Sequence, residues 1–390
     1  MLAILTSHPI QYQAPLWRAL AADGRVPFEV WFLTPHGVQP TRDVEFGHTF
    51  AWDEDLLSGY RHHFVPVCEG WSLDRFRGVR PRRPWSKLLD ERGVTTLWVE
   101  GWRFDTLWQA IGHAQDTGRR VWLRGESSDL IPEAWHARWW KRPLLRRLFA
   151  HMDAFLTIGS ANRRFYQRYG VPESRLHPAP YSVDNDGWSA VVNARRSRRA
   201  ELRARWGVAP EARCLLFAGK LTPRKRPLDL IAAATRLPRS LGPLHLLFAG
   251  EGELRDALAE ALKQPGAPPA TLAGFLNLSQ MPEAYAAADA LVLPSDHETW
   301  GLAVNEALAS GLPVVVSDRC GCAADLVAPV EPSLIFRSGD VEDLSRALRR
   351  LLEHAPAADA WAQVLRRHHV QTTVATVANL WMHARSPAHV

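Results

Sequence analysis

Short apolar runs alternate with segments of helical periodicity along most of this chain of 390 residues. Strands that are joined by helices pair in parallel, so the alternation predicts an α/β fold built from doubly wound sheets. In the first half, apolar residues at helical spacing cover residues 15–22 and 107–115. The runs expected to form strands there are residues 2–5, 28–33, 96–99, 120–123 and 154–158.

A second alternation starts near residue 190, where the charged run 193–205 is expected to form a solvated linker and helix. The simplest architecture has two Rossmann-like domains, residues 1–190 and 191–370, which face each other across a cleft. Residues 371–390 are expected to be a C-terminal helix that returns to the N-terminal domain. The second-half strands are expected at 214–218, 244–249, 271–274, 290–293 and 313–317, and the helices at 228–237, 281–288, 303–310 and 341–352.

The composition excludes several classes of protein. Hydrophobic residues make up 46% of the chain and charged residues 23%, which is typical of a globular protein and not of a disordered one. No apolar run approaches the ~18 residues of a membrane span, and the N-terminus lacks the basic region of a signal peptide. We therefore expect a cytoplasmic protein.

Four cysteines are too few for a disulfide framework in a chain of this length. Cys320 and Cys322 form a C-x-C pair, but no second Cys/His pair at zinc spacing accompanies it. We expect a structural role for the pair and no metal site.

The string at residues 294–315 (PSDHETWGLAVNEALASGLPVV) carries the strongest chemical signal. An apolar strand ends before it, a short polar loop follows, and a helix is expected to begin near Gly301. The free N–H groups of a first helical turn bind anions, and glycine allows the backbone to approach a ligand. Glu298 in the loop and Glu306 in the helix can then face one ligand that carries hydroxyls and phosphates. The alternative is an ordinary amphipathic helix with Glu306 facing solvent.

A basic loop follows the first strand of the second domain, with the sequence FAGKLTPRKRP at residues 217–227. Lys220 and Lys225 are expected at the carboxyl edge of the sheet. Cations fixed there would stabilise the negative charge that a departing diphosphate gains in the transition state. The alternative is a solvated basic loop without a ligand.

Together these strings resemble glycosyltransferase family 4, whose members have the GT-B fold and are retaining enzymes. Its E-x₇-E signature matches Glu298, which would contact the transferred sugar, and Glu306, which would bind the ribose hydroxyls. The resemblance places the diphosphate on Gly219, Lys220, Lys225 and the backbone amides of Gly301 and Leu302, and the base near Leu276. Arg226 stands where the family often has glycine. The resemblance covers residues 150–352, and the first 150 residues only in architecture.

The N-terminal domain departs further from the family pattern. After the first strand the family usually has a Gly-rich loop, whereas this chain has a polar turn with His8, Gln11 and Gln13. We expect these three residues to contact acceptor or donor, with a role in starting the next helix as the alternative. Glu126 lies near the position of a histidine in many members and is the candidate acceptor-side catalytic group. Tyr181 replaces the asparagine of another family segment.

These observations predict a retaining, metal-independent glycosyltransferase that moves a sugar from a nucleoside diphosphate sugar, UDP or GDP type, to an acceptor hydroxyl. The resemblance implies that Lys220 and Lys225 neutralise the diphosphate in place of a metal ion, and no cofactor is expected. Alternatives are a nucleotide-sugar epimerase and a non-catalytic sensor of nucleotide sugars. A dinucleotide-dependent dehydrogenase is disfavoured, because the loop at residues 7–15 contains no glycine.

The acceptor is the least determined part of the function. Residues 70–150 hold 16 Lys+Arg against 9 Asp+Glu, and residues 71–87 and 135–149 interleave aromatic and basic side chains. Such helices dock on anionic membranes, which predicts a peripheral protein at the inner membrane face that acts on a glycan or glycolipid in surface or capsular polysaccharide assembly. The alternatives are buried tryptophans with solvated arginines, and a soluble small-molecule acceptor. No nucleic-acid-binding module accompanies the pattern.

Overall fold

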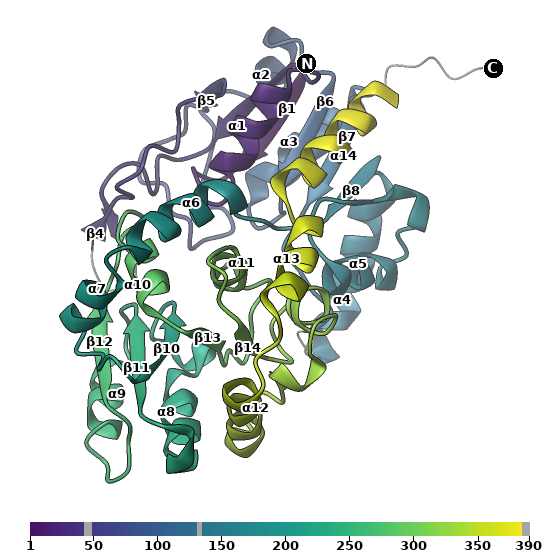
Figure 1. Ribbon diagram of the computed structural model, residues 1–390. Helices are drawn as coiled ribbons and strands as arrows, with labels where there is room; N and C mark the ends of the chain where they lie inside the picture. Colours follow the sequence, from purple (N-terminus) through teal and green to yellow (C-terminus); the bar gives the residue numbers. More distant parts are fainter. Residues whose placement is uncertain (43–48, 131–134, 384–390) are drawn as a thin grey trace. The chain divides into compact units, whose positions relative to one another are not determined.

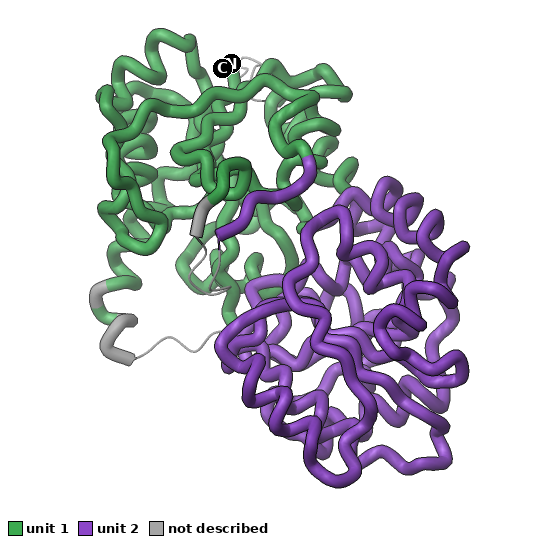
Figure 2. Tube along the Cα trace, turned by 90° about the vertical axis from the view of Figure 1, so that its left-hand side faces the viewer, with its two compact units in different colours: residues 1–41, 55–181, 370–390 green, residues 42–54, 182–369 purple. Residues whose placement is uncertain are grey.

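The computed structural model describes residues 1–42, 49–130 and 135–383 (Figure 1). The chain forms two compact units, coloured separately in Figure 2. Unit 1 contains Met1–Thr41, Asp55–Tyr181 and the chain from Val370 on, and unit 2 contains Arg42–Glu54 and Ser182–His369. These bounds differ from those expected at residues 190 and 370, chiefly because Arg42–Glu54 belongs to unit 2.

Unit 1 is built on a parallel sheet of seven strands, as the alternation of strands and helices predicted. Strand β1 lies in its middle, with the strand that follows it on one side and a later strand on the other. The order is β5 (His62–Phe64), β2 (Phe28–Phe32), β1 (Leu2–Thr6), β6 (Thr96–Glu100), β7 (Arg120–Arg124), β8 (Ala154–Thr157) and β9 (Leu176–Pro178).

Alternate residues of the unit 1 strands build two hydrophobic layers, one on each face of the sheet. Ala3 and Leu5 belong to one layer, and Leu2 and Ile4 belong to the other, because successive side chains of a strand point to opposite faces. Helices α1 (Ala14–Asp23) and α14 (Val370–His383) pack on the second face. The remaining helices are α2 (Trp85–Glu91), α3 (Asp105–Asp116), α4 (Trp135–Ala150) and α5 (Ser160–Arg168).

Unit 2 repeats this plan with six parallel strands. Their order is β12 (Ala270–Gly274), β11 (Leu244–Ala249), β10 (Arg213–Ala218), β13 (Ala290–Leu293), β14 (Val314–Ser317) and β15 (Ile335–Phe336). The helices are α6 (Asn185–Arg196), α7 (Arg199–Arg205), α8 (Pro227–Thr235), α9 (Arg255–Ala261), α10 (Met281–Ala287), α11 (Leu302–Ala309), α12 (Val341–Glu353) and α13 (Ala358–Arg367). The predicted fold class, α/β with two doubly wound Rossmann-like domains, is confirmed.

The segment Arg42–Glu54 belongs to unit 2 because of side-chain contacts that could not be predicted from the sequence. It contains β4 (Thr49–Phe50), which pairs with β3 (Thr41–Arg42). The ring of Phe50 lies 5.1 Å from that of Phe275, and the Asn277 amide donates to the Ala51 carbonyl at 2.9 Å. The loop after β12 is therefore covered by a segment that lies 226 positions earlier in the chain, counted from Asn277 to Ala51.

The charged run 193–205 is less solvated than expected. It forms the end of α6 and the whole of α7. Arg199 and Arg203 both pair with Asp289, at 2.6 and 3.1 Å, and the Arg203 side chain is buried. Two of its arginines therefore anchor α7 to the body of unit 2.

Within the described part of the chain, no helix is long and apolar enough to cross a membrane.

Candidate functional site

The residues predicted for the donor lie where the strand order of unit 2 reverses. Strand β10 is followed in the chain by β11 on one side, whereas β13 lies on its other side. Loops that leave the carboxyl ends of two such strands diverge and leave room for a ligand. The loop after β10 carries Gly219, Lys220 and Lys225, and the loop after β13 carries Glu298 and Gly301.

The loop after β10 contains two residues with positive φ, Gly219 and Arg226. Gly219 has a φ of 151°. Its carbonyl oxygen lies close to Gly250, and a Cβ added to Gly250 would be 1.9 Å from that oxygen. Arg226 has a φ of 49°, the only positive value among the described residues other than glycine. Its guanidinium bonds to Asp229 at 2.7 Å. Arg226, which stands where the resembling family often has glycine, therefore adopts a left-handed conformation that favours glycine.

Lys225 and Glu298, predicted separately from two strings, form an ion pair. Their side chains are 14% and 12% exposed, so the pair is largely removed from water. Lys225 lies at the end of a short 3₁₀ turn, Pro223–Lys225, and Lys220 lies half-buried earlier in the same loop. The structure thus brings together the predicted sugar-contacting carboxylate and a predicted diphosphate cation.

The backbone of the segment that contains the cysteine pair supports the Glu298 loop. The backbone N–H of Glu298 donates to the Arg319 carbonyl at 3.1 Å, and the N–H of Gly321 donates back to Glu298 at 3.0 Å. A Cβ at Gly321 would meet the Thr299 carbonyl oxygen at 2.0 Å. Cys320 and Cys322 are buried, and burial raises the pKa of the Cys320 thiol to about 12. Among the described residues, no group of three or more His, Cys, Asp or Glu could hold a metal ion.

Gly301 starts helix α11 in a conformation that favours glycine. Its φ is 102°, and a Cβ there would meet side chains of Leu293 at 3.1 Å and Glu298 at 3.3 Å. Gly301 supplies no side-chain cap to the helix, and Leu302 is the first helical residue. The first-turn N–H groups of α11 therefore lie beside Glu298 without a side-chain cap, in the arrangement expected for an anion site.

Glu306 is not a solvent-facing helix residue. It is 5% exposed, and the Tyr285 hydroxyl donates to its Oε2 at 2.6 Å. The interpretation of this segment as an ordinary amphipathic helix with an exposed Glu306 is therefore wrong. Tyr285, on α10, is a neighbour that the sequence analysis did not identify.

The predicted base-contacting residue, Leu276, lies half-buried in the loop between β12 and α10. The residues around it are fixed by contacts within unit 2. The side-chain amide of Asn277 bonds to Ala51, and the backbone N–H of Ser279 donates to Asp53 at 3.2 Å.

In unit 1, a second group of polar residues collects at the equivalent reversal, between β1 and β6. Glu100, the last residue of β6, accepts a 3.3 Å hydrogen bond from Gln13, and the Gln13 side chain is buried at 4% exposure. Gln13 is the N-cap residue of α1. Its side chain makes no capping hydrogen bond to the helix and bonds to Glu100 instead.

Glu126 follows β7 and is exposed, but its carboxylate is held from beneath. It accepts a hydrogen bond from the buried Tyr181 hydroxyl. The Arg124 guanidinium lies over the Tyr181 ring at 4.6 Å and donates to the Ala179 carbonyl at 3.1 Å. Burial, with the charge of Glu126, raises the pKa of Tyr181 well above its ordinary value.

Glu100 is the most perturbed carboxyl group of this edge. Burial raises its pKa to about 7, against the opposing charge of Arg124, whose Nη1 lies 3.9 Å from Glu100 Oε1. Sequence reasoning assigned no role at this edge to Glu100, Arg124 or Tyr181. The available signal was a charged residue at the end of an apolar strand, which both Glu100 and Arg124 provide.

The other predicted acceptor-side residues lie in the turn after β1. His8 is half-buried, bonds to the Ser7 hydroxyl at 2.8 Å and packs edge-on against His36 at 4.9 Å. Burial and the neighbouring His36 lower the pKa of His8 to about 3, so its imidazole is neutral at physiological pH. Gln11 is half-buried in the same turn.

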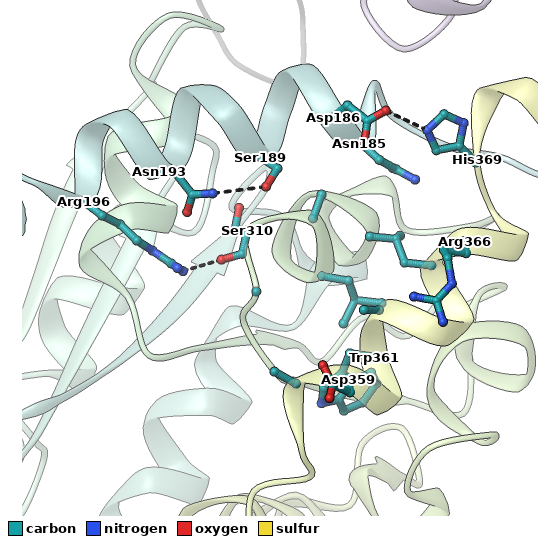
Figure 3. Close-up of a pocket in the computed structure, with 16 residues that line it drawn as sticks. Asn185, Asp186, Ser189, Asn193, Arg196, Ser310, Asp359, Trp361, Arg366 and His369 are labelled. Atoms are coloured by element: carbon teal, nitrogen blue, oxygen red, sulfur yellow. Dashed lines mark hydrogen bonds and ion pairs between the residues drawn. The ribbon is translucent and has the colours of Figure 1, made fainter.

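A pocket of about 380 Å³ lies elsewhere in unit 2, between α6, α13 and the C-terminal end of α11 (Figure 3). Figure 3 shows His369 paired with Asp186, at 3.3 Å, on one side and Asn193 bonded to Ser189, at 3.3 Å, on another. The residues predicted for the donor are not among those that line it. The pocket is therefore distinct from the loops after β10 and β13.

Comparisons with known proteins agree with this arrangement. Residues 198–368 match the family model "Glycosyl transferases group 1". The chain is 32% identical over 210 residues to a GDP-mannose-dependent alpha-mannosyltransferase of Mycolicibacterium smegmatis, which is 54% of this chain and 50% of that protein. It is 33% identical over 161 residues to a sulfoquinovosyl transferase of Arabidopsis thaliana, which is 40% of this chain and 30% of that protein. The chain thus spans half or less of the length of these two relatives.

Similarity of structure extends over the whole chain. The structure of Anabaena HepE in complex with UDP and glucose matches with a TM-score of 0.70 at 16% identity, over 98% of this chain and 99% of that one. The predicted GT-B fold is thereby confirmed.

Proposed function

We propose that this chain is a retaining glycosyltransferase that transfers a sugar from a nucleoside diphosphate sugar to an acceptor hydroxyl. The observation that carries the proposal is the convergence of Lys225, Glu298 and Gly301 at the strand-order reversal of unit 2. The match of residues 198–368 to glycosyl transferases group 1 covers the same loops.

Each part of the donor has a partner of suitable chemistry. Lys220, Lys225 and the first-turn amides at Gly301 and Leu302 would hold the diphosphate, whose charge grows as the glycosidic bond breaks. Glu298 would contact the sugar, Glu306 the ribose, and the backbone at Leu276 the base. Because Lys225 is paired with Glu298 without ligand, the diphosphate would compete with that carboxylate for the lysine.

Unit 1 would bind the acceptor through the edge that carries His8, Gln11 and Glu126. In the front-face mechanism of the resembling family, the acceptor oxygen bonds to the anomeric carbon. At the same time the bond between that carbon and the phosphate oxygen of the donor breaks. The acceptor proton passes to the leaving phosphate oxygen. Glu126, held by Tyr181, is an acceptor of hydrogen bonds and would orient the reacting hydroxyl. The lysines neutralise the leaving group, so we propose no metal and no other cofactor.

NMR of reactions with UDP-glucose and GDP-mannose tests this proposal. The acceptors are a mixture of methyl glycosides and glycolipids. We expect release of UDP or GDP that depends on the acceptor, and a product with the α-configuration of the donor. An inverted product would overturn the retaining mechanism. An altered nucleotide sugar formed without acceptor would favour an epimerase.

We further propose that the acceptor is presented at an anionic membrane surface, at the inner membrane face. On α4, Trp139 is 80% exposed and Leu144 46%, and Arg142, Arg146 and Arg147 are exposed beside them. The side chains of residues 135–138 and 140 lie outside the described part. In the other predicted stretch Phe76 is exposed, but Trp85 is buried in the core, as are Trp17, Trp31 and Trp98. Much of the aromatic excess is therefore core.

Sedimentation with vesicles of phosphatidylcholine and phosphatidylglycerol tests the membrane proposal. We expect binding at low salt that weakens at high salt and in a Trp139→Ala/Arg142→Ala/Arg146→Ala variant. If wild-type protein stayed in the supernatant at low salt, the search for the acceptor would move to soluble molecules.

A further inference from the structure

Three side chains converge on Glu306, the carboxylate proposed to bind the ribose. The Tyr285 hydroxyl donates to its Oε2 at 2.6 Å. The Trp188 indole N–H donates to its backbone carbonyl at 3.0 Å, and the Ser310 hydroxyl donates to the same oxygen at 2.7 Å. These donors come from α10, from α6 and from the residue after α11, so both ends of the Glu306 residue are fixed from separate elements.

Tyr285 itself has little freedom to move. Its side chain is fully buried, and its ring packs edge-on against Trp188 with centroids 5.4 Å apart and planes at 82°. The same tryptophan therefore holds the Glu306 backbone and one side of the Tyr285 ring. A glutamate loses considerable rotamer freedom when a ligand fixes it, and a partner that fixes it beforehand removes that cost from binding.

The chemical nature of the partner matters as much as its position. A buried carboxylate needs hydrogen bonds, and a cation would supply them together with a neutralising charge. Tyr285 supplies a neutral hydroxyl donor to Glu306 Oε2 and adds no charge of its own. A carboxylate offers about four acceptor sites on two oxygens, and the phenol bonds to one oxygen, Oε2. Such a carboxylate is suited to a pair of vicinal hydroxyl donors.

We propose that Tyr285, backed by Trp188, is a positioning residue that orients Glu306 toward the 2′- and 3′-hydroxyls of a ribonucleoside diphosphate. The inference rests on the proposed function, because it assumes a nucleotide donor in unit 2. It adds that recognition of the ribose diol depends on a residue that does not touch the nucleotide.

Calorimetric titration of Tyr285→Phe tests the inference without any acceptor. The probes are UDP and GDP, and the 2′,3′-dideoxy form of whichever wild-type protein binds more tightly. Wild-type protein should bind the ribonucleotide roughly 10- to 100-fold more tightly than the dideoxy form, as expected for hydrogen bonds to a charged group. In Tyr285→Phe this ratio should fall about fivefold or more, while the affinity for the dideoxy form stays within about twofold.

The control is Tyr166→Phe, which removes the hydroxyl of another fully buried tyrosine, in unit 1, and should leave the ratio unchanged. A purely structural role for Tyr285 would weaken both nucleotides equally or lower only the melting temperature, and either result would overturn the inference. If Tyr285→Phe did not fold, the same ratio of ribonucleotide to dideoxynucleotide affinity would be measured for Trp188→Phe. The inference predicts that this ratio also falls. Wild-type protein that bound neither UDP nor GDP would overturn the proposed function itself.

Discussion

Glu298 and Glu306 carry the same functional group but have different partners. Glu298 forms an ion pair with Lys225, a cation that a diphosphate could also bind. Glu306 accepts a hydrogen bond from the neutral hydroxyl of Tyr285. The first pair can change partner when a ligand arrives, and the second contact can persist. The two carboxylates should therefore respond differently to loss of charge.

Neutralising each carboxylate should have a different effect on the affinity for nucleoside diphosphates. Glu306→Gln should weaken UDP or GDP binding roughly 10- to 100-fold, because it removes charged hydrogen bonds to the ribose. Glu298→Gln should leave this affinity unchanged or raise it, because Lys225 is released toward the diphosphate, and should lower kcat instead. Calorimetry and steady-state kinetics measure both effects. Equal loss of nucleotide affinity in the two variants would contradict the assigned roles.

Glu100 should make stability depend on pH. Burial raises its pKa in the folded protein to about 7 from an ordinary value of 4.5, so the folded state holds a proton that the unfolded state releases. Its contribution is present below pH 4.5 and is lost as the pH rises toward 7. The free energy of unfolding of wild-type protein, relative to Glu100→Gln, should therefore fall between pH 5 and pH 8. Denaturant melts at both pH values check this, and a difference that rises with pH would contradict it.

At the scale of elements, strands were the most predictable feature. Buried parallel strands such as β10 and β13 are continuous apolar runs, and the expected ends lie within a residue or two of those observed. Edge strands β5 and β9 were missed, because three residues carry too little pattern. The attachment of residues 49–54 to the loop after β12 could not be predicted, because it depends on contacts between distant segments.

The turn that enters α8 should depend on the backbone of Arg226. A left-handed conformation costs an ordinary residue about 1–2 kcal/mol and a β-branched residue more. The free energy of unfolding of Arg226→Gly should therefore lie within about 1 kcal/mol of the wild-type value, because relief of backbone strain offsets the loss of the bond to Asp229. Arg226→Val should be less stable than Arg226→Gly by about 1–2 kcal/mol. Both variants lose the bond to Asp229, so their difference in chemical denaturation isolates the backbone term. Equal stabilities would mean that the turn is not strained.

At the scale of the whole molecule, both units place polar residues where their strand order reverses. For unit 2 the sequence strings sufficed to predict where these residues lie, because Lys220, Lys225 and Glu298 stand on loops next to clear strands and Glu306 in the helix that follows. For unit 1 they did not. The roles of Glu100, Arg124 and Tyr181 arise from neighbours brought together only by folding.

The central claim is that unit 2 binds a nucleotide sugar and stabilises its departing diphosphate. Its most direct test measures the release of UDP or GDP from UDP-glucose and GDP-mannose, with the acceptor mixture present, for wild type and for Lys220→Ala/Lys225→Ala. The matched control is Lys263→Ala, because Lys263 is an exposed lysine on the surface of the same unit. We predict that the double variant releases nucleotide at least about 100-fold more slowly in kcat/KM, and that the control equals wild type. Release by the double variant at the wild-type rate would contradict the account.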